Sequence, residues 1–161
     1  MVYIMEIYVD GGCRGNGQWG AIGAAAVAFK KRSGKHQCWT RHLPIFLTPT
    51  NQRAEITAII MALEKALEKY RELESNPYLD VKIYSDSRYA INCMTTWIYK
   101  WSRNGWRNAA GNEVANKDFI QEASLLDDEL KEEGDVDYIW IPREENDIAD
   151  SLCNQAMDEQ E

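Results

Sequence analysis

Hydrophobic and polar positions in the first half of the chain predict three strands followed by one long helix. Residues 5–9 alternate closely enough for a strand, and residues 21–30 and 37–46 have the character of two more strands joined by a basic turn. Within residues 51–73, one helical face gathers six apolar side chains: Ile56, Ile59, Ile60, Leu63, Leu67 and Tyr70. We therefore expect an antiparallel meander followed by an amphipathic helix.

In the second half, strands and helices alternate. Pro77 ends the long helix, and residues 78–85 form a fourth strand, after which Ser87 is suited to cap a helix. Residues 118–133 predict an acidic helix, residues 137–141 a fifth strand, and Asn146 the cap of a last helix. The order β-β-β-α-β-α-α-β-α predicts an α/β fold with a five-stranded mixed sheet flanked by helices.

The helices after the fourth strand have different apolar faces. After Ser87, one face combines Ile91, Met94 and Ile98, and beside it runs a diagonal stripe of i, i+4 neighbours: Tyr89, Cys93, Trp97 and Trp101. The apolar residues of the acidic helix are Phe119, Ile120, Leu125, Leu126 and Leu130. The last helix is expected to turn Ile148, Ala149, Leu152 and Ala156 inward.

Composition favours a single intracellular domain. With 161 residues, 45% of them hydrophobic, the chain can build one sizeable core. Its four cysteines form no CxxC pair and have no histidine at zinc-finger spacing, which favours a reduced protein without structural zinc. The start, MVYIMEIYVD, contains an acid, lacks a basic n-region and is too short to span a bilayer. We expect a cytosolic or nuclear protein without signal peptide or membrane anchor.

The net charge of −8 hides a strong asymmetry along the chain. Residues 1–117 carry a net charge of +6 and residues 118–161 one of −14, and no acid occurs between Gly11 and Ala54. Such a distribution within one domain suggests a basic binding face and an acidic back. A solvated acidic helix explains the C-terminal excess equally well but not the acid-free run.

Four acids stand where chemistry collects in α/β folds. Asp10 precedes two glycines that are expected to turn the chain and expose its carboxylate at a strand end, and Asp86 occupies the equivalent position after the fourth strand. Glu55 lies roughly 60° from the apolar face of its helix, and Asp150 is nearer an apolar edge than Asp147.

If these four acids converge, their mutual repulsion needs relief. Two Mg²⁺ ions about 3.5 to 4 Å apart, shared with a substrate phosphate, would provide it and would clamp an in-line displacement. A separate structural role for each acid is the alternative, as for Glu55, which the helix dipole favours near a helix start.

The segment 83–119 interleaves basic and aromatic side chains. Lys100, Arg103, Arg107 and Lys117 occur among Trp97, Trp101 and Trp106, a combination suited to a phosphate backbone with stackable sugars or bases. A packed amphipathic helix with a solvated basic tip is the alternative interpretation.

The sequence from Gly15 to Gly20 spells GxGxxG, but its context excludes a dinucleotide site. A strand pattern follows instead of a helix, and no acid appears before Glu55. A calcium loop fails as well, because Gly12 and Arg14 stand at ligand positions. The glycines are better suited to a hairpin-like loop that a ligand can approach closely.

Five motifs together resemble the type 1 ribonuclease H family over nearly the whole chain. They are YVDGG, TNQRAEITA, IYSDSRYAIN, TWIYKWSRNGW and NDIADSL, and the second and fourth are similar to the eukaryotic branch with its basic protrusion. The resemblance implies a ribonuclease H-like fold formed by one catalytic domain spanning residues 1–161. It also implies a monomer that needs no membrane and cleaves the RNA strand of RNA/DNA hybrids with Mg²⁺ or Mn²⁺.

The resemblance also assigns roles to single residues. The metal-binding carboxylates would be Asp10, Glu55, Asp86 and Asp150, with a metal-activated water leaving a 3′-hydroxyl and a 5′-phosphate. The expected nucleic-acid contacts are Asn16, Asn51 and Gln52 in the minor groove and at RNA 2′-hydroxyls, Tyr89, Trp97 and Trp101 along the DNA strand, Thr50 and Asn116 at a DNA phosphate, and Lys100, Arg103 and Arg107 on the basic protrusion.

Three positions depart from the family pattern. The shorter loop of residues 142–145 replaces the usual loop with its mobile histidine, Thr48 stands where an arginine is expected, and Arg88 replaces a smaller or apolar residue. We expect activity with altered turnover, because metal assembly does not need that histidine. Two alternatives remain, namely a nucleic-acid-binding module with impaired catalysis and a two-metal enzyme acting on DNA.

Overall fold

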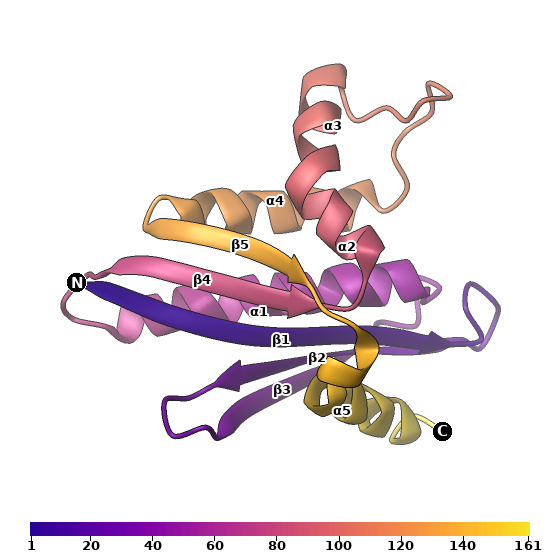
Figure 1. The fold of residues 1–161 in the computed structure, drawn as a ribbon. Helices are drawn as coiled ribbons and strands as arrows, with labels where there is room; N and C mark the ends of the chain where they lie inside the picture. The colour runs from indigo at the N-terminus through magenta and orange to yellow at the C-terminus, as the bar shows by residue number, and fades with distance from the viewer.

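The computed structural model describes all 161 residues and contains one mixed five-stranded sheet (Figure 1). Its strands are β1 (Val2–Arg14), β2 (Ile22–Lys30), β3 (His36–His42), β4 (Tyr78–Ser85) and β5 (Gly134–Trp140). They lie in the order β3-β2-β1-β4-β5, and β2 pairs antiparallel with both β1 and β3, whereas β4 pairs parallel with both β1 and β5. The predicted fold class and the order of the elements are confirmed.

Helices cover both faces of the sheet. They are α1 (Asn51–Glu72), α2 (Arg88–Asn92), the π-helical turn η1 (Cys93–Trp97), α3 (Ile98–Asn104), α4 (Lys117–Lys131), the 3-10 turn η2 (Arg143–Glu145) and α5 (Asp147–Asp158). Figure 1 shows α1 and α4 behind the sheet, α5 in front of it, and α3 projecting away from it. None of these helices combines the length and apolar character needed to cross a membrane.

Helix α1 forms where the apolar period predicts it. The Thr50 side chain accepts a hydrogen bond from the Arg53 backbone N–H at 3.1 Å and thereby caps the first turn. Ile56, Ile59 and Leu63 are fully buried, and they pack in the main core with residues from β1 and β4. The buried apolar face of α1 fixes the helix against the sheet.

Strand β1 is longer than predicted, and the reason is Gly11. Gly11 and Gly12 do not turn the chain; they pair with Ala25 and Ala24 of β2. A Cβ on Gly11 would lie 2.2 Å from the carbonyl oxygen of Ala54 in α1, so glycine is needed for close helix approach. The predicted position of Asp10 at a strand end is therefore wrong, since Asp10 lies within β1.

The other boundaries differ at strand ends. Strand β3 ends at His42, four residues before the predicted end, because Pro44 follows and cannot donate to a ladder. Ile45 and Phe46, predicted as strand residues, are 78% and 83% exposed. Strand β5 begins three residues earlier than predicted, at Gly134, where a Cβ would meet the backbone of Leu79.

Two predicted helix faces need correction. Leu125 in α4 is 70% exposed and Ile148 in α5 is 40% exposed, so neither is a core residue. The helix after Ser87 is interrupted by η1, where the Ile98 N–H bonds to the Cys93 carbonyl. This π-helical turn brings Cys93 into the core beside Met94, whereas the aromatic residues predicted to share its stripe are only partly buried.

Candidate active site

Three of the four predicted acids lie in β1, α1 and α5, and Asp86 lies in the turn after β4. All four line one open cavity of about 390 Å³. Val9 of β1 pairs with Ser85 of β4, so Asp10 and Asp86 follow neighbouring positions of parallel strands. Helix α1 brings Glu55 to the cavity, and α5, which packs on the opposite face of the sheet, brings Asp150. The predicted equivalence of Asp10 and Asp86 and the convergence of all four acids are observed.

Asp10 is the acid whose ionisation the fold disfavours most. Burial raises its pKa to about 8, and the neighbouring carboxylates of Asp86 and Asp150 contribute to the rise. The backbone N–H of Gly11 acts in the opposite direction and does not compensate. The cavity therefore favours a proton or a cation at Asp10.

Glu55 is held by the residue that caps α2. The Ser87 hydroxyl donates to a Glu55 carboxylate oxygen at 2.6 Å and accepts from the Ala90 backbone N–H at 3.0 Å. Burial raises the pKa of Glu55 although the Ser87 hydrogen bond lowers it. The predicted cap at Ser87 is confirmed, and the same hydroxyl orients a cavity acid.

Asn146 stands at the start of α5, but its side chain does not cap that helix. Its amide donates to the Val9 carbonyl at 2.8 Å and lies 3.4 Å from an Asp86 carboxylate oxygen. Burial raises the pKa of Asp86, and Asn146 and Arg143 partly offset the rise. The predicted capping role of Asn146 is therefore wrong, because its amide serves the sheet and Asp86.

Asp150 is paired with Arg143. One guanidinium nitrogen of Arg143 lies 3.0 Å from an Asp150 carboxylate oxygen, and Arg143 itself belongs to η2 in the loop that replaces the expected histidine loop. Arg143 lines the cavity with the four acids, a placement that the sequence analysis did not predict. The sequence did mark Arg143 as unusual, because it is one of only two cations after residue 117.

The donor set of the cavity fits a hard divalent cation. Its acids supply carboxylate oxygens, which suit Mg²⁺ or Mn²⁺ better than soft metals. As the side chains lie, no three His, Cys, Asp or Glu residues surround one point closely enough to hold an ion. Glu55, Asp86 and Asp150 are each turned toward a protein partner, so side-chain rotation must accompany metal binding.

Beside the cavity, hydrogen bonds connect the glycine-rich loop around residues 15–20 to the start of α1. The Asn16 side-chain oxygen accepts from the Asn51 backbone N–H at 2.8 Å, and the Asn51 side-chain oxygen accepts from the Cys13 backbone N–H at 3.0 Å. Gly17 donates its N–H to the Pro49 carbonyl at 3.0 Å. These bonds place the predicted minor-groove residues in one polar rim, and Asn51 also lines the cavity.

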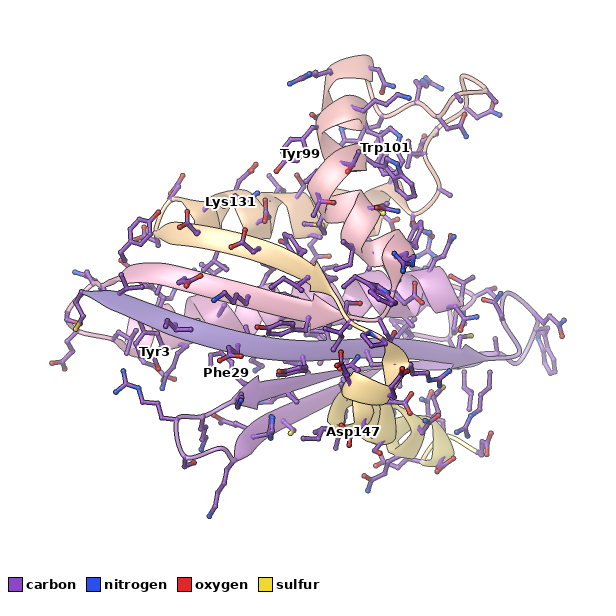
Figure 2. The ribbon with its side chains drawn as sticks, in the orientation of Figure 1. Tyr3, Phe29, Tyr99, Trp101, Lys131 and Asp147 are labelled. Carbon is purple, nitrogen blue, oxygen red and sulfur yellow. The ribbon has the colours of Figure 1, made fainter.

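A row of aromatic rings leads away from that rim. Tyr89, Trp97, Trp101 and Trp106 follow each other with ring centroids 6.0, 5.7 and 6.1 Å apart. The Asn116 amide donates to the Tyr89 hydroxyl at 3.1 Å and to the Gln52 side-chain oxygen at 3.3 Å. Asn116 therefore joins the aromatic row to the start of α1, and Figure 2 shows Trp101 on the projecting helix.

The basic side chains of α3 and of the loop that follows it are accessible to a ligand. Lys100, Arg103 and Arg107 are exposed and take part in no ion pair. Arg88, by contrast, lies with its guanidinium 4.0 Å from the centroid of the Trp140 ring. The departure at Arg88 is thus accommodated by stacking on Trp140.

Comparisons with known proteins agree with this geometry. The ribonuclease H family model matches residues 3–158. Ribonuclease H of Hydrogenovibrio crunogenus is 36% identical over 162 residues, which cover 96% of each chain. Ribonuclease H of Francisella philomiragia is 34% identical over 159 residues, covering 94% of this chain and 90% of its own. The structure of LC11-RNase H1 in complex with an RNA/DNA hybrid is similar with a TM-score of 0.71 at 23% identity, covering 97% of this chain and 98% of that one.

A mixed five-stranded sheet with carboxylates gathered beside its central parallel strands has the ribonuclease H-like fold. The chain belongs to the ribonuclease H family, since the family model spans nearly all of it. It is a type 1 ribonuclease H, an endonuclease that acts on RNA/DNA hybrids, and enzymes of this family depend on metal ions.

Proposed function

We propose that Asp10, Glu55, Asp86 and Asp150 hold two divalent cations, Mg²⁺ or in its place Mn²⁺, for hydrolysis of the RNA strand. The observation that carries this proposal is the convergence of four acids from distant segments of the chain in one cavity. When bound, the ions would activate the attacking water and stabilise the charge that develops on the phosphate. Cleavage then leaves a 3′-hydroxyl and a 5′-phosphate.

The chain's own residues orient the acids for this task. Asp10 and Asp86 directly follow the paired residues Val9 and Ser85 of parallel strands, and a cation there would offset the burial and the repulsion that raise the pKa of Asp10. Ser87 holds one carboxylate oxygen of Glu55 and Asn146 one of Asp86, which keeps both side chains at the cavity until rotation brings them to a cation. When a cation binds, Arg143 would either remain paired with Asp150 or move away from it.

The hybrid is proposed to lie across the start of α1 and along the aromatic row. Asn16, Asn51 and Gln52 would read the minor groove and RNA 2′-hydroxyls, and Thr50 and Asn116 would hold a DNA phosphate. Tyr89, Trp97 and Trp101 would pack on DNA sugars, with Lys100, Arg103 and Arg107 on the phosphates beyond them. The Asn116 hydrogen bonds to Tyr89 and Gln52 support one continuous surface.

Catalysis is proposed to proceed without the usual mobile histidine. The loop of residues 142–145 supplies Arg143 instead, and no acid of the cavity depends on a histidine for its position. We expect activity with altered turnover, from a single-domain monomer whose protrusion resembles that of the eukaryotic branch.

The proposal is tested with an end-labelled RNA/DNA hybrid and Mg²⁺, comparing the parent with Asp86→Asn. The parent should cut the RNA strand, and Asp86→Asn should lose activity by at least about 100-fold. Asp137→Asn is the matched control, because Asp137 is exposed on β5 and lies outside the cavity. Equal activity of parent and Asp86→Asn would contradict the metal-ligand assignment.

The same assay distinguishes two alternative functions. The Arg143–Asp150 ion pair and the missing histidine favour a binding module, for which the parent would bind the hybrid but not cut it even with Mn²⁺. A DNA-directed two-metal enzyme would instead prefer duplex DNA over the hybrid and over duplex RNA.

A further inference from the structure

Most of the acid-free basic run lies away from the active site, and of its cations only Arg14 lines that cavity. Lys30, Lys31 and Arg32 lie at the turn between β2 and β3, which Figure 1 shows at the end of the sheet near the N-terminus. Asp10 pairs with Ala26, whereas Lys30 pairs with Glu6. Along the strands, four residues separate the Asp10–Ala26 pair from the Glu6–Lys30 pair, a distance of about 13 Å at 3.3 Å per residue. The basic turn therefore lies outside the cavity that holds the four acids.

A groove of about 570 Å³ lies beside that turn, between the start of β1, the β2–β3 hairpin and the C-terminal half of α1. Tyr3, Phe29 and Trp39 contribute aromatic surface to it, and Figure 2 shows Tyr3 and Phe29 at this end of the molecule. The ammonium group of Lys65 lies 4.8 Å from the centroid of the Trp39 ring. Aromatic surface and a cation are thus already combined in the groove.

The groove carries surplus positive charge although the chain is acidic as a whole. Its two acids, Glu68 and Glu72, are paired with Lys65 at 3.1 Å and Lys69 at 3.9 Å. Lys30, Lys31 and Arg32 line the same groove, are exposed, and form no ion pair. A complementary ligand therefore carries negative charge together with a planar or apolar group.

We propose that this groove is a second nucleic-acid site, which binds a single strand extending from the hybrid. Phosphates would meet Lys30, Lys31 and Arg32, and a base would contact the aromatic surface near Trp39. The cations continue past the groove to Lys35, which favours a strand with several phosphates over a free nucleotide. Measured along the strands, Lys30 lies about 13 Å from the level of Asp10, which corresponds to some 4 nucleotides at about 3.4 Å each.

The test compares a blunt RNA/DNA hybrid with the same hybrid carrying a single-stranded tail of about ten thymidines, a length chosen to exceed the estimated span. Binding is measured without divalent cations, so that no substrate is consumed. The tail should raise the affinity of the parent about tenfold, the worth of one stacked base. Lys31→Glu should remove most of that gain and leave the affinity for the blunt hybrid unchanged.

Lys82→Glu is the matched control, because it makes the same change of charge on a strand outside both sites. It should keep the gain from the tail. The proposal is overturned if the tail adds nothing to the parent, or if Lys31→Glu and Lys82→Glu reduce the gain equally. Thymidine monophosphate that binds the groove while the tail adds nothing would also overturn it, in favour of a free nucleotide.

This proposal relies on the hybrid lying at the active-site face but not on the four acids. Cleavage of the blunt hybrid with Mg²⁺ is therefore measured in parallel. Loss of the tail effect with intact cleavage contradicts the second site alone, whereas a parent that binds the tail but cuts nothing contradicts the proposed catalysis alone.

Discussion

Gly11 is the residue that sets how closely α1 approaches β1. The Ala54 carbonyl occupies the space that a Cβ would need, and Glu55, the next residue, faces the cavity. The distance between sheet and helix therefore also sets the distance between Asp10 and Glu55. At Gly12, its neighbour, a Cβ would meet the flexible end of Met157 at 3.0 Å and the Cys153 sulfur at 3.4 Å.

We predict that Gly11→Ala destabilises the protein by about 3 kcal/mol, because backbone must move to admit the methyl group. Gly12→Ala should cost less than about 1 kcal/mol, since the Met157 side chain can shift. Urea unfolding of both variants measures the difference. Equal losses would show that contact with α1 is not what requires glycine at position 11.

Asp10 makes the stability of the metal-free protein depend on pH. Its pKa is about 8 in the fold against an ordinary 3.8, so between these values the folded chain holds a proton that the unfolded chain releases. Stability should thus be highest near pH 4 on this account and fall as pH rises toward 8. In a chelator, Asp10→Asn should show a flatter profile by thermal unfolding. A parent profile that rises over this range would contradict the assignment.

Among single residues, the sequence predicted the four acids but missed the residues that contact them from across the fold. The four acids were found because two follow apolar strand patterns and the other two lie near the apolar edge of their helices. Arg143 and the amide of Asn146 were missed as parts of the cavity, because their partners are Asp150 and Asp86 across the fold. Gly11 was misassigned to a turn, since the demand for close approach comes from α1, more than 40 residues later.

At the scale of elements, the projecting helix α3 is tied to α4 through a buried polar group. Asp127 of α4 is 1% exposed, accepts from the Tyr138 hydroxyl at 2.6 Å, and pairs with Lys131 at 2.9 Å. Lys131 in turn donates to the Tyr99 hydroxyl of α3 at 3.0 Å, and Figure 2 shows Tyr99 and Lys131 between the two helices. This chain of contacts positions the basic protrusion.

We predict that Asp127→Asn lowers the free energy of unfolding by about 1 to 3 kcal/mol, because a buried charge-assisted hydrogen bond is lost. Glu129→Gln is the control: Glu129 pairs with Arg71 across α1 and α4, but both side chains are largely exposed, so its loss should stay below about 1 kcal/mol. Denaturant midpoints measure both changes. Equal effects would mean that burial of Asp127 contributes nothing.

Elements were predictable where one face of each is buried. The spacing of apolar residues in α1 and the composition of β4 determine the bounds of these two elements. In η1, by contrast, the π-helical turn adds one residue to a helix that the sequence pattern predicts as continuous. The inserted turn lets Met94 and Cys93 share the core while Trp97 stays partly exposed. The aromatic row therefore depends on a backbone irregularity that periodicity could not reveal.

At the scale of the whole molecule, the positive charges form two separate surfaces on an acidic protein. One is the protrusion with Lys100, Arg103 and Arg107, and the other is the groove beside the β2–β3 turn. The predicted basic face is thus divided between two ends of the fold. Because neither surface is neutralised by ion pairs, both should attract phosphates in a salt-dependent way.

The two surfaces should differ in how they enter the kinetics of hybrid cleavage. We predict that Lys100→Gln combined with Arg103→Gln raises KM for a blunt hybrid but leaves kcat nearly unchanged, because α3 does not line the cavity with the acids. Each lost phosphate contact should reduce the slope of log affinity against log salt by about 0.7 to 0.9. Lys31→Gln, at the other surface, should change neither KM nor the slope for a blunt substrate. A fall in kcat at constant KM in the α3 variant would mean that the protrusion acts on the chemical step and not on binding.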